Sequence, residues 1–185
     1  LRDVDYPLPS AEQLARVGWP KGADRLARAI LAVNLHFGAL DFADGHTVSY
    51  DSLRLREYHH VFPDALLQEG GISNSYLALN CALVTWKTNR NIGRKDPLAY
   101  LRHRVEWSDE ATVRHRLRTH LLDYDSLSRA TYKANGKPLQ GVVLADRLRQ
   151  DFEQFLAHRA ALVAVAATSL SEGRHVMLEQ LLQDS

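Results

Sequence analysis

Cysteine is almost absent from the chain: Cys81 is the only one among 185 residues, so no internal disulfide can form. A single thiol is typical of a reducing cytoplasm. Long apolar runs are missing as well, since the stretch AALVAVAATSL (160–170) falls short of the roughly 18 residues of a membrane span and indicates a buried helix. No secretory signal peptide is recognisable, and the first residue is leucine. We expect a cytoplasmic protein with no membrane contact, cut from something longer.

Excess positive charge is small overall but concentrated in one segment. The net charge is +1 at pH 7, which argues against a polycation that binds nucleic acid with its whole surface. Residues 81–104 nevertheless carry six basic side chains against the single acid Asp96: Lys87, Arg90, Arg94, Lys95, Arg102 and Arg104. Such a cluster is either a solvated face or a set of phosphate contacts, and charge alone leaves both readings open.

Hydrophobic periodicity predicts a mainly helical α+β protein with a strand–loop–strand–helix unit in its middle. One strand ends near His60, and the run CALVTW (81–86) is the second. Ser10 and Asp96 are expected to cap helices that begin at the next residue. Further helices are expected at 22–40, 64–68, 109–122, 142–170 and 174–183, with a loop at 133–138 and a turn at Asp44-Gly45 of the kind that separates strands.

Two adjacent histidines, His59 and His60, end the first predicted strand in REYHHVFP. Neighbouring side chains on a regular strand point to opposite faces, so the pair can share one site only if the backbone bends. Pro63 and the pair Gly70-Gly71 indicate such a bend. A histidine with its ordinary pKa of about 6.5 serves as a general base or as a neutral metal ligand. A bare His-His pair is more often structural.

Two asparagines, Asn80 and Asn89, bracket the second predicted strand nine positions apart. An asparagine before a strand can hold a loop by hydrogen bonding its backbone. One at the start of a helix can offer its carbonyl oxygen to a hard cation such as Mg²⁺. Asn91 could take the second role on chemistry alone.

The other histidines and the tryptophans are given no role in chemistry. His115 and His120 are five positions apart, a poor spacing for two ligands on one helical face, and both are expected at the surface. The remaining candidates are expected to be solvated or to pack, rather than to stack on bases: His103, His158, Trp19, Trp86 and Trp107.

The motif set HHVFP…N…LVTWKTNRNIGRKDPLAYL resembles the His-Me finger (HNH) nucleases, and most of all the C-terminal domain of GmrSD-type DNA restriction endonucleases. These domains share the His-His-(Ile/Val)-Phe-Pro element, the asparagine before an apolar strand and the closing Lys-Asp-Pro-x-x-Tyr. The later FEQFLAHR is similar to the family's FL-x-x-R helix. The resemblance spans roughly residues 24–170. It implies a ββα-metal unit at 46–106 embedded in one domain, between a helical lead-in at 1–45 and a helical part at 107–185.

The resemblance also implies roles for individual residues. His60 corresponds to the general base that activates water, and His59 to the preceding metal ligand. Asn80 matches the loop-holding asparagine of the catalytic set, and Asn89 matches the second metal ligand. The implied ion is Mg²⁺, with Mn²⁺ or a transition metal as alternatives because imidazole is a softer ligand than carboxylate. The basic residues beside Asn89 are expected to contact DNA phosphates: Arg90, Arg94 and Lys95.

By resemblance, the chain is expected to nick double-stranded DNA as the effector half of a prokaryotic defence system. In that family an N-terminal NTPase-like sensor module usually precedes the nuclease, and nothing in this sequence resembles it. Two rival functions stay open: a ribonuclease or nonspecific toxin nuclease on the same finger, and a non-catalytic DNA-binding module.

Overall fold

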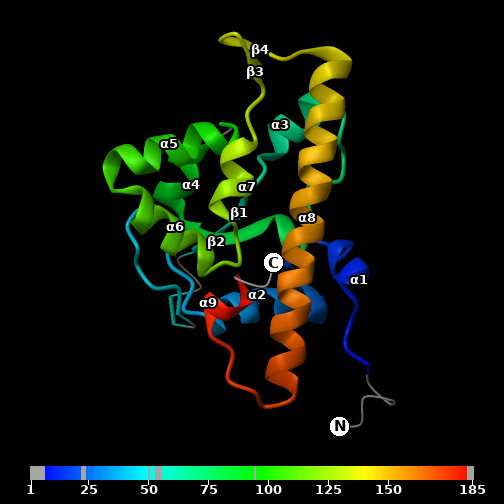
Figure 1. Ribbon diagram of the computed structural model, residues 1–185, viewed down its shortest axis with the longest axis vertical. Helices are drawn as coiled ribbons and strands as arrows, with labels where there is room; N and C mark the ends of the chain where they lie inside the picture. Colours follow the sequence, from blue (N-terminus) through cyan, green and yellow to red (C-terminus); the bar gives the residue numbers. More distant parts are fainter. Residues whose placement is uncertain (1–6, 22–23, 50, 53–55, 94, 183–185) are drawn as a thin grey trace.

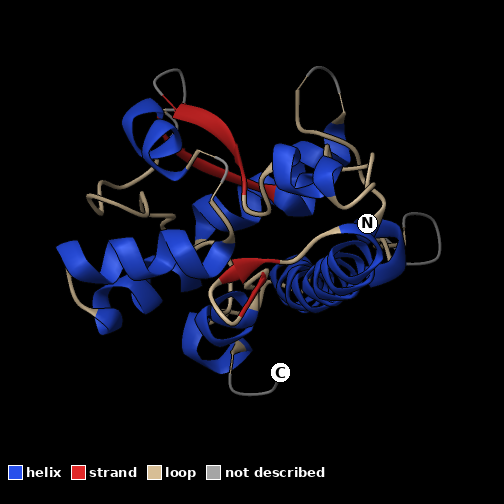
Figure 2. Cartoon of the chain, turned by 90° about the horizontal axis from the view of Figure 1, so that it is seen from above, coloured by secondary structure: helices blue, strands red, loops and turns tan. Residues whose placement is uncertain are grey.

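One long helix organises the protein. The computed structural model describes residues 7–21, 24–49, 51–52, 56–93 and 95–182. Helix α8 (Gly141–Ser171) runs along the molecule in Figure 1 and is seen nearly end-on in Figure 2. Its apolar positions are buried against α1 (Ala11–Ala15) and α2 (Arg25–His36), and one connected core cluster reaches from Leu14 to Leu181. The fold is therefore α+β and mainly helical, as the periodicity predicted.

The strand–loop–strand–helix unit is present in the middle of the chain. Strand β1 (Arg56–His60) pairs antiparallel with β2 (Cys81–Thr85), and α4 (Trp86–Ile92) follows β2 directly. The connection between the strands contains α3 (Asp64–Glu69) and the short 3-10 helix η2 (Ala78–Asn80). All β2 residues but the last are buried, because the ribbon is enclosed by helices. Residues 53–55, the predicted start of the first strand, lie outside the described part of the chain.

The predicted helix caps are confirmed. The Ser10 hydroxyl accepts from the backbone N–H of Gln13, whose side chain bonds back to Ser10, which completes a capping box at the start of α1. Asp96 accepts from the N–H of Ala99 at 2.8 Å and begins α5 (Pro97–Trp107). The remaining helices are α6 (Glu110–Arg118), α7 (Tyr124–Arg129) and α9 (Leu178–Leu181).

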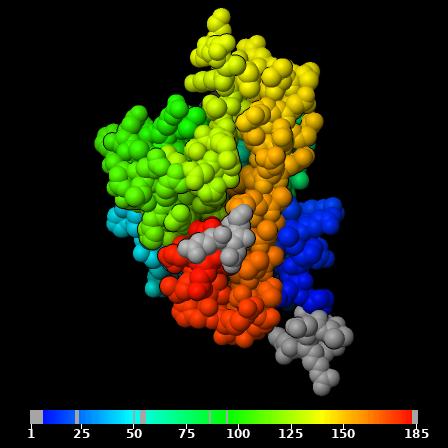
Figure 3. Space-filling model, in the orientation of Figure 1, coloured from blue at the N-terminus to red at the C-terminus, as the bar shows by residue number. Residues whose placement is uncertain are grey.

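Two local predictions were wrong. The expected loop at 133–138 is a small hairpin, β3 (Lys133–Ala134) and β4 (Lys137–Pro138), which projects from one end of the molecule in Figure 3. Asn135 and Gly136 both have positive φ (52° and 77°), the conformation that matches the twist of a two-residue hairpin turn. The Asp44-Gly45 turn, by contrast, joins no named strands in the described part of the chain and is enclosed by the isolated antiparallel bridge between Leu40 and Thr47.

Among the described residues, no helix combines the length and apolar character that crossing a bilayer requires.

Candidate metal-binding and catalytic site

The two adjacent histidines lie on opposite faces of strand β1. The strand is paired regularly to its end, with His59 opposite Ala82 and His60 opposite Cys81. Successive side chains therefore alternate, so His59 shares a face with Glu57, and His60 shares the other with Tyr58. The predicted bend that would turn both imidazoles to one side is absent, because the β-ladder holds the backbone extended through both residues.

On the first face, a hydrogen-bonded chain joins β1 to helix α4. The Asn89 Nδ2 amide donates to Glu57 Oε2 at 2.6 Å, and Asn89 Oδ1 lies 2.7 Å from His59 Nδ1. Because the amide nitrogen faces the carboxylate, its oxygen must accept, so Nδ1 of His59 carries the proton. The other ring nitrogen, Nε2, is then unprotonated, and it is buried without a hydrogen-bond partner.

Local sequence places Asn89 over the strand. The Thr85 hydroxyl caps α4 by accepting from the N–H of Thr88. The buried carboxylate of Asp41 supports this start of the helix, because it accepts from the Thr85 N–H at 2.6 Å and from the Thr88 hydroxyl at 2.7 Å. These hydrogen bonds hold the pKa of Asp41 below its ordinary value despite an opposing effect of burial. Asp41 is thus a positioning residue for the helix that carries Asn89.

Burial sets the charge state of His59. Its side chain is 2% exposed, and loss of hydration lowers its pKa to about 4 against the opposing effects of Asn89, Asp41 and Glu57. At neutral pH the imidazole is uncharged, the form that binds metal ions. The expectation that His120 lies at the surface was wrong: its ring is fully buried, and Nε2 lies 2.8 Å from the Leu40 carbonyl. Burial lowers its pKa to about 4 as well.

The protein should lose stability on mild acidification. His59 and His120 have folded-state pKa values near 4, below the ordinary value of 6.5, so the unfolded chain binds more protons between these limits. The free energy of unfolding is expected to fall by about 1 kcal/mol per pH unit for each histidine as pH drops from 6.5 to about 4. Urea unfolding at several pH values measures this slope. His120→Gln should reduce the slope of stability against pH, whereas His175→Gln, at an exposed position, should not. Equal slopes in the wild type and in both variants would contradict the contribution assigned to His120.

On the second face, His60 is enclosed by aromatic rings. Its imidazole stacks on Trp19 with ring centres 4.2 Å apart, and Tyr76 meets it edge-on at 4.8 Å. Burial lowers the pKa of His60, while Asp64 opposes the shift. Its Nε2 atom is buried and has no hydrogen-bond partner in the described part of the protein. Trp19 is therefore a packing residue, as the sequence indicated.

Asn80 holds the loop that follows β1, as predicted. Its Oδ1 accepts from the Phe62 N–H at 2.8 Å, and its Nδ2 donates to the carbonyls of Phe62 and Ser75, both at 3.0 Å. A second support comes from Tyr100 of α5, whose hydroxyl donates to the Val61 carbonyl at 3.2 Å. The backbone directly after His60 is thus fixed from two sides.

Asn80→Ala is expected to destabilise the fold by about 2–4 kcal/mol, because three buried backbone groups lose their partners and each costs on the order of 1 kcal/mol or more. The matched control is Asn91→Ala, since the Asn91 side chain is exposed on α4. Chemical denaturation of both variants measures the difference. A loss below about 1 kcal/mol for Asn80→Ala would show that the three Asn80 hydrogen bonds contribute little to stability.

A residue of the long helix fixes the other end of the connection. Arg159 is 1% exposed, and its guanidinium donates to the carbonyls of Leu79 (2.5 Å), Cys81 (2.9 Å) and His120 (2.9 Å). Burial lowers the pKa of Arg159 to about 10, which still leaves it charged at neutral pH. Two of these carbonyls, those of Leu79 and Cys81, flank Asn80, so Arg159 positions the backbone on both sides of Asn80 from α8.

The donors on the Asn89 face fit a divalent ion. Among the described residues, no three His, Cys, Asp or Glu side chains gather closely enough to hold a metal, so a metal here needs Asn89 as a ligand. Glu57 and Asn89 offer the oxygen atoms that Mg²⁺ and Mn²⁺ prefer. For His59 to bind the same ion, the ion would have to replace the Nδ1 proton that now bonds to Asn89 Oδ1. Asn91 is not part of this chain of contacts. His60, on the opposite face, does not join the three donors.

The predicted phosphate contacts are only partly described. Arg90 and Lys95 are exposed near the end of α4, and the Lys95 ammonium donates to the Asn91 carbonyl at 2.9 Å. Arg94 lies outside the described residues. Both described cations are therefore placed at the surface close to Asn89, where solvent and a polyanion can reach them.

Sequence reasoning missed three residues of this site: Glu57, Asp41 and Arg159. Strand alternation is a signal for the first, because Glu57 precedes His59 by two positions and so shares its face. The hydrogen bonds of Asp41 to the N–H groups of Ala43 and Asp44 mark only a local turn, and its partners at the start of α4 lie more than 40 positions away. Arg159 sits within an apolar run that was interpreted as core, although the FL-x-x-R likeness includes it.

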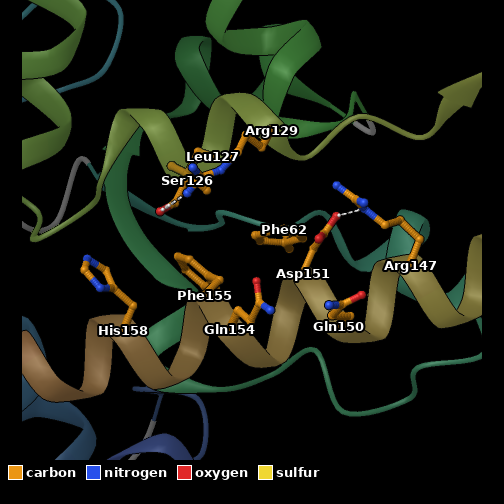
Figure 4. A pocket seen from close by; sticks show the side chains of 10 residues that line it. All are labelled: Phe62, Ser126, Leu127, Arg129, Arg147, Gln150, Asp151, Gln154, Phe155 and His158. Atoms are coloured by element: carbon orange, nitrogen blue, oxygen red, sulfur yellow. Dashed lines mark hydrogen bonds and ion pairs between the residues drawn. The ribbon is translucent and has the colours of Figure 1, made fainter.

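A separate cavity of about 300 Å³ lies between α7 and α8. Figure 4 shows side chains of both helices around it, with Phe62 and Phe155 lining it and Arg147 bound to Asp151. None of the residues of the Glu57–Asn89–His59 chain lines this cavity. It is therefore distinct from the candidate site.

Comparisons with known proteins add little. No protein-family model matches the chain, and no solved structure does. It is similar to uncharacterized protein MJ0686 of Methanocaldococcus jannaschii, with 35% identity over 69 residues. The aligned segment covers 36% of this chain and 11% of that protein, so the match shows a shared segment and no activity.

Proposed function

We propose that the chain is a metal-dependent DNA endonuclease that hydrolyses phosphodiester bonds. The observation that supports this most is the direct contact between His59 and Asn89, 30 positions apart, within a β-ribbon and helix. Resemblance to His-Me finger nucleases had assigned the metal to the same two residues. Asn80, in the loop-holding position of that motif, hydrogen bonds the backbone just after His60.

In this proposal His59 and Asn89, with Glu57 beside them, hold Mg²⁺ or Mn²⁺. When bound, the ion would neutralise charge on the phosphate and on the departing oxygen. His60 is the general base in this proposal, and its lowered pKa keeps the ring neutral at pH 7. Its Nε2 atom is buried without a protein partner, so the proposal requires water to reach it beside Trp19 and Tyr76. His60 is the last residue of β1, and its side chain lies on the face of the strand opposite His59.

The wider context of the proposal rests on the resemblance. The nuclease would cut foreign double-stranded DNA in the cytoplasm of a prokaryote, as the effector of a restriction system with an NTPase or sensor module. Arg90, Arg94 and Lys95 would contact backbone phosphates without reading sequence, which predicts binding that weakens with salt.

The test is cleavage of supercoiled plasmid by the purified chain with Mg²⁺ or Mn²⁺, beside the same reaction in EDTA. Conversion to open circle that depends on the ion supports a nicking nuclease, because one such site cuts one strand at a time. A parallel reaction with RNA distinguishes the ribonuclease alternative. DNA binding without cleavage of either polymer, under both metals, would instead favour the non-catalytic module.

A further inference from the structure

A second cavity, of about 450 Å³, opens between the loop at Ala43–Asp44, helix α4 and helix α5. Its volume lies within the range of about 300–1,000 Å³ typical of small-molecule sites. Neither His59, His60 nor Asn89 lines it. The cavity is therefore a different place from the proposed hydrolytic site, although α4 contributes to both.

Two cations line this cavity, and neither forms an ion pair within the described part of the protein. Arg104 is 8% exposed, and its Nε atom is buried with no hydrogen-bond partner. Lys87 is exposed on α4 and has no hydrogen bond to another described residue. The acid at the rim, Asp44, lies 3.0 Å from His46 Nδ1, a contact that is an ion pair only when His46 is protonated. A nine-tenths buried guanidinium with an unused donor is unusual, because buried charges are normally paired.

An exposed aromatic ring stands beside these cations. Trp107 is 78% exposed, the highest value among the large hydrophobic side chains that the structure describes. Its indole Nε1 lies 3.2 Å from His103 Nε2, and His103 Nδ1 lies 2.5 Å from Arg104 Nη2. Both partners are donors and a neutral imidazole has one acceptor nitrogen, so His103 accepts from one of them at a time. The three side chains are therefore neighbours at the cavity wall. The expectation that Trp107 packs in the core or at its edge was wrong, because the ring ends α5 in solvent.

We infer that this cavity binds a nucleoside monophosphate unit, with the phosphate on Arg104 and Lys87 and the base on Trp107. Guanidinium groups match the oxygen geometry of phosphate, and an exposed indole stacks on any base because every base has a π-face. The unit comes either from a free nucleotide or from a single nucleic-acid strand. This inference goes beyond the proposed nuclease, since binding here requires neither metal nor cleavage.

The test is a binding titration in EDTA with deoxyadenosine monophosphate, a single-stranded DNA 10-mer and inorganic phosphate, monitored by tryptophan fluorescence and by calorimetry. Trp107→Ala should weaken both base-bearing ligands about tenfold or more and leave phosphate unchanged. Lys87→Ala should weaken all three. The matched control is Val142→Ala, because Val142 is 75% exposed on α8, far along the chain from the cavity.

Tighter binding of the 10-mer would identify a strand as the ligand, and equal binding would identify a free nucleotide; both support the site. Equal affinity of the wild type and Trp107→Ala for every ligand would overturn the inference, as would no binding at millimolar concentration. Both tested side chains are exposed, so loss of folding does not confuse the result. Failure of plasmid cleavage would leave these titrations unaffected and would count against the nuclease alone.

Discussion

Replacing His60 with alanine is expected to lower the rate of plasmid cleavage by about 10²–10⁴-fold, the usual contribution of a general base. The burial-lowered pKa of His60 keeps its ring neutral at pH 7, and its Nε2 atom has no hydrogen-bond partner among the described residues. The measurement is the rate at which supercoiled plasmid becomes open circle with Mg²⁺ or Mn²⁺. His175→Ala is the matched control, since that histidine is exposed on the far C-terminal segment.

The opposite orientation of the two histidines makes a comparison of their variants decisive. His59→Ala removes a proposed metal ligand, so higher Mn²⁺ concentration should restore part of its activity but none of that of His60→Ala. If His60→Ala cleaves at the wild-type rate while His59→Ala is inactive, His60 is not the base. If both variants cleave like the wild type under each metal, the nuclease proposal is wrong, and retained DNA binding would favour the binding module.

Arg159→Met is expected to destabilise the fold by about 3–5 kcal/mol. The methionine side chain fills much of the space but donates no hydrogen bond, so the carbonyls of Leu79, Cys81 and His120 lose their buried partner. An unsatisfied buried acceptor costs about 1–3 kcal/mol, and removal of the buried charge offsets part of the sum. Chemical denaturation followed by circular dichroism measures the change in the free energy of unfolding.

Two further variants test the cause of that loss. Arg149→Met removes an exposed arginine from the same helix and should change stability by no more than about 0.5 kcal/mol. Arg159→Lys keeps a donor and should recover part of the loss. A wild-type stability for Arg159→Met would show that water or neighbouring side chains satisfy these carbonyls, and Arg159 would then have no positioning role.

Much of the fold could be predicted from interactions between residues close together in the sequence. Ser10, Asp96 and Pro97 mark helix starts through contacts within three residues, so the boundaries of α1 and α5 follow from the chain itself. The nine-residue interval between Asn80 and Asn89 likewise spans one strand and the first turn of a helix. The hairpin at 133–138 was missed although Asn135-Gly136 is a turn signal, because its strands are only two residues long.

The sequence by itself determined the α+β class, the order of the central elements and the residues available for chemistry. Only the tertiary structure decided how those residues meet. The β-ladder, whose partners are 21 to 29 positions apart, sends His59 to α4 and His60 to Trp19. Arg159 reaches Leu79 from 80 positions away. Such contacts depend on packing between distant segments, which no local pattern of side chains encodes.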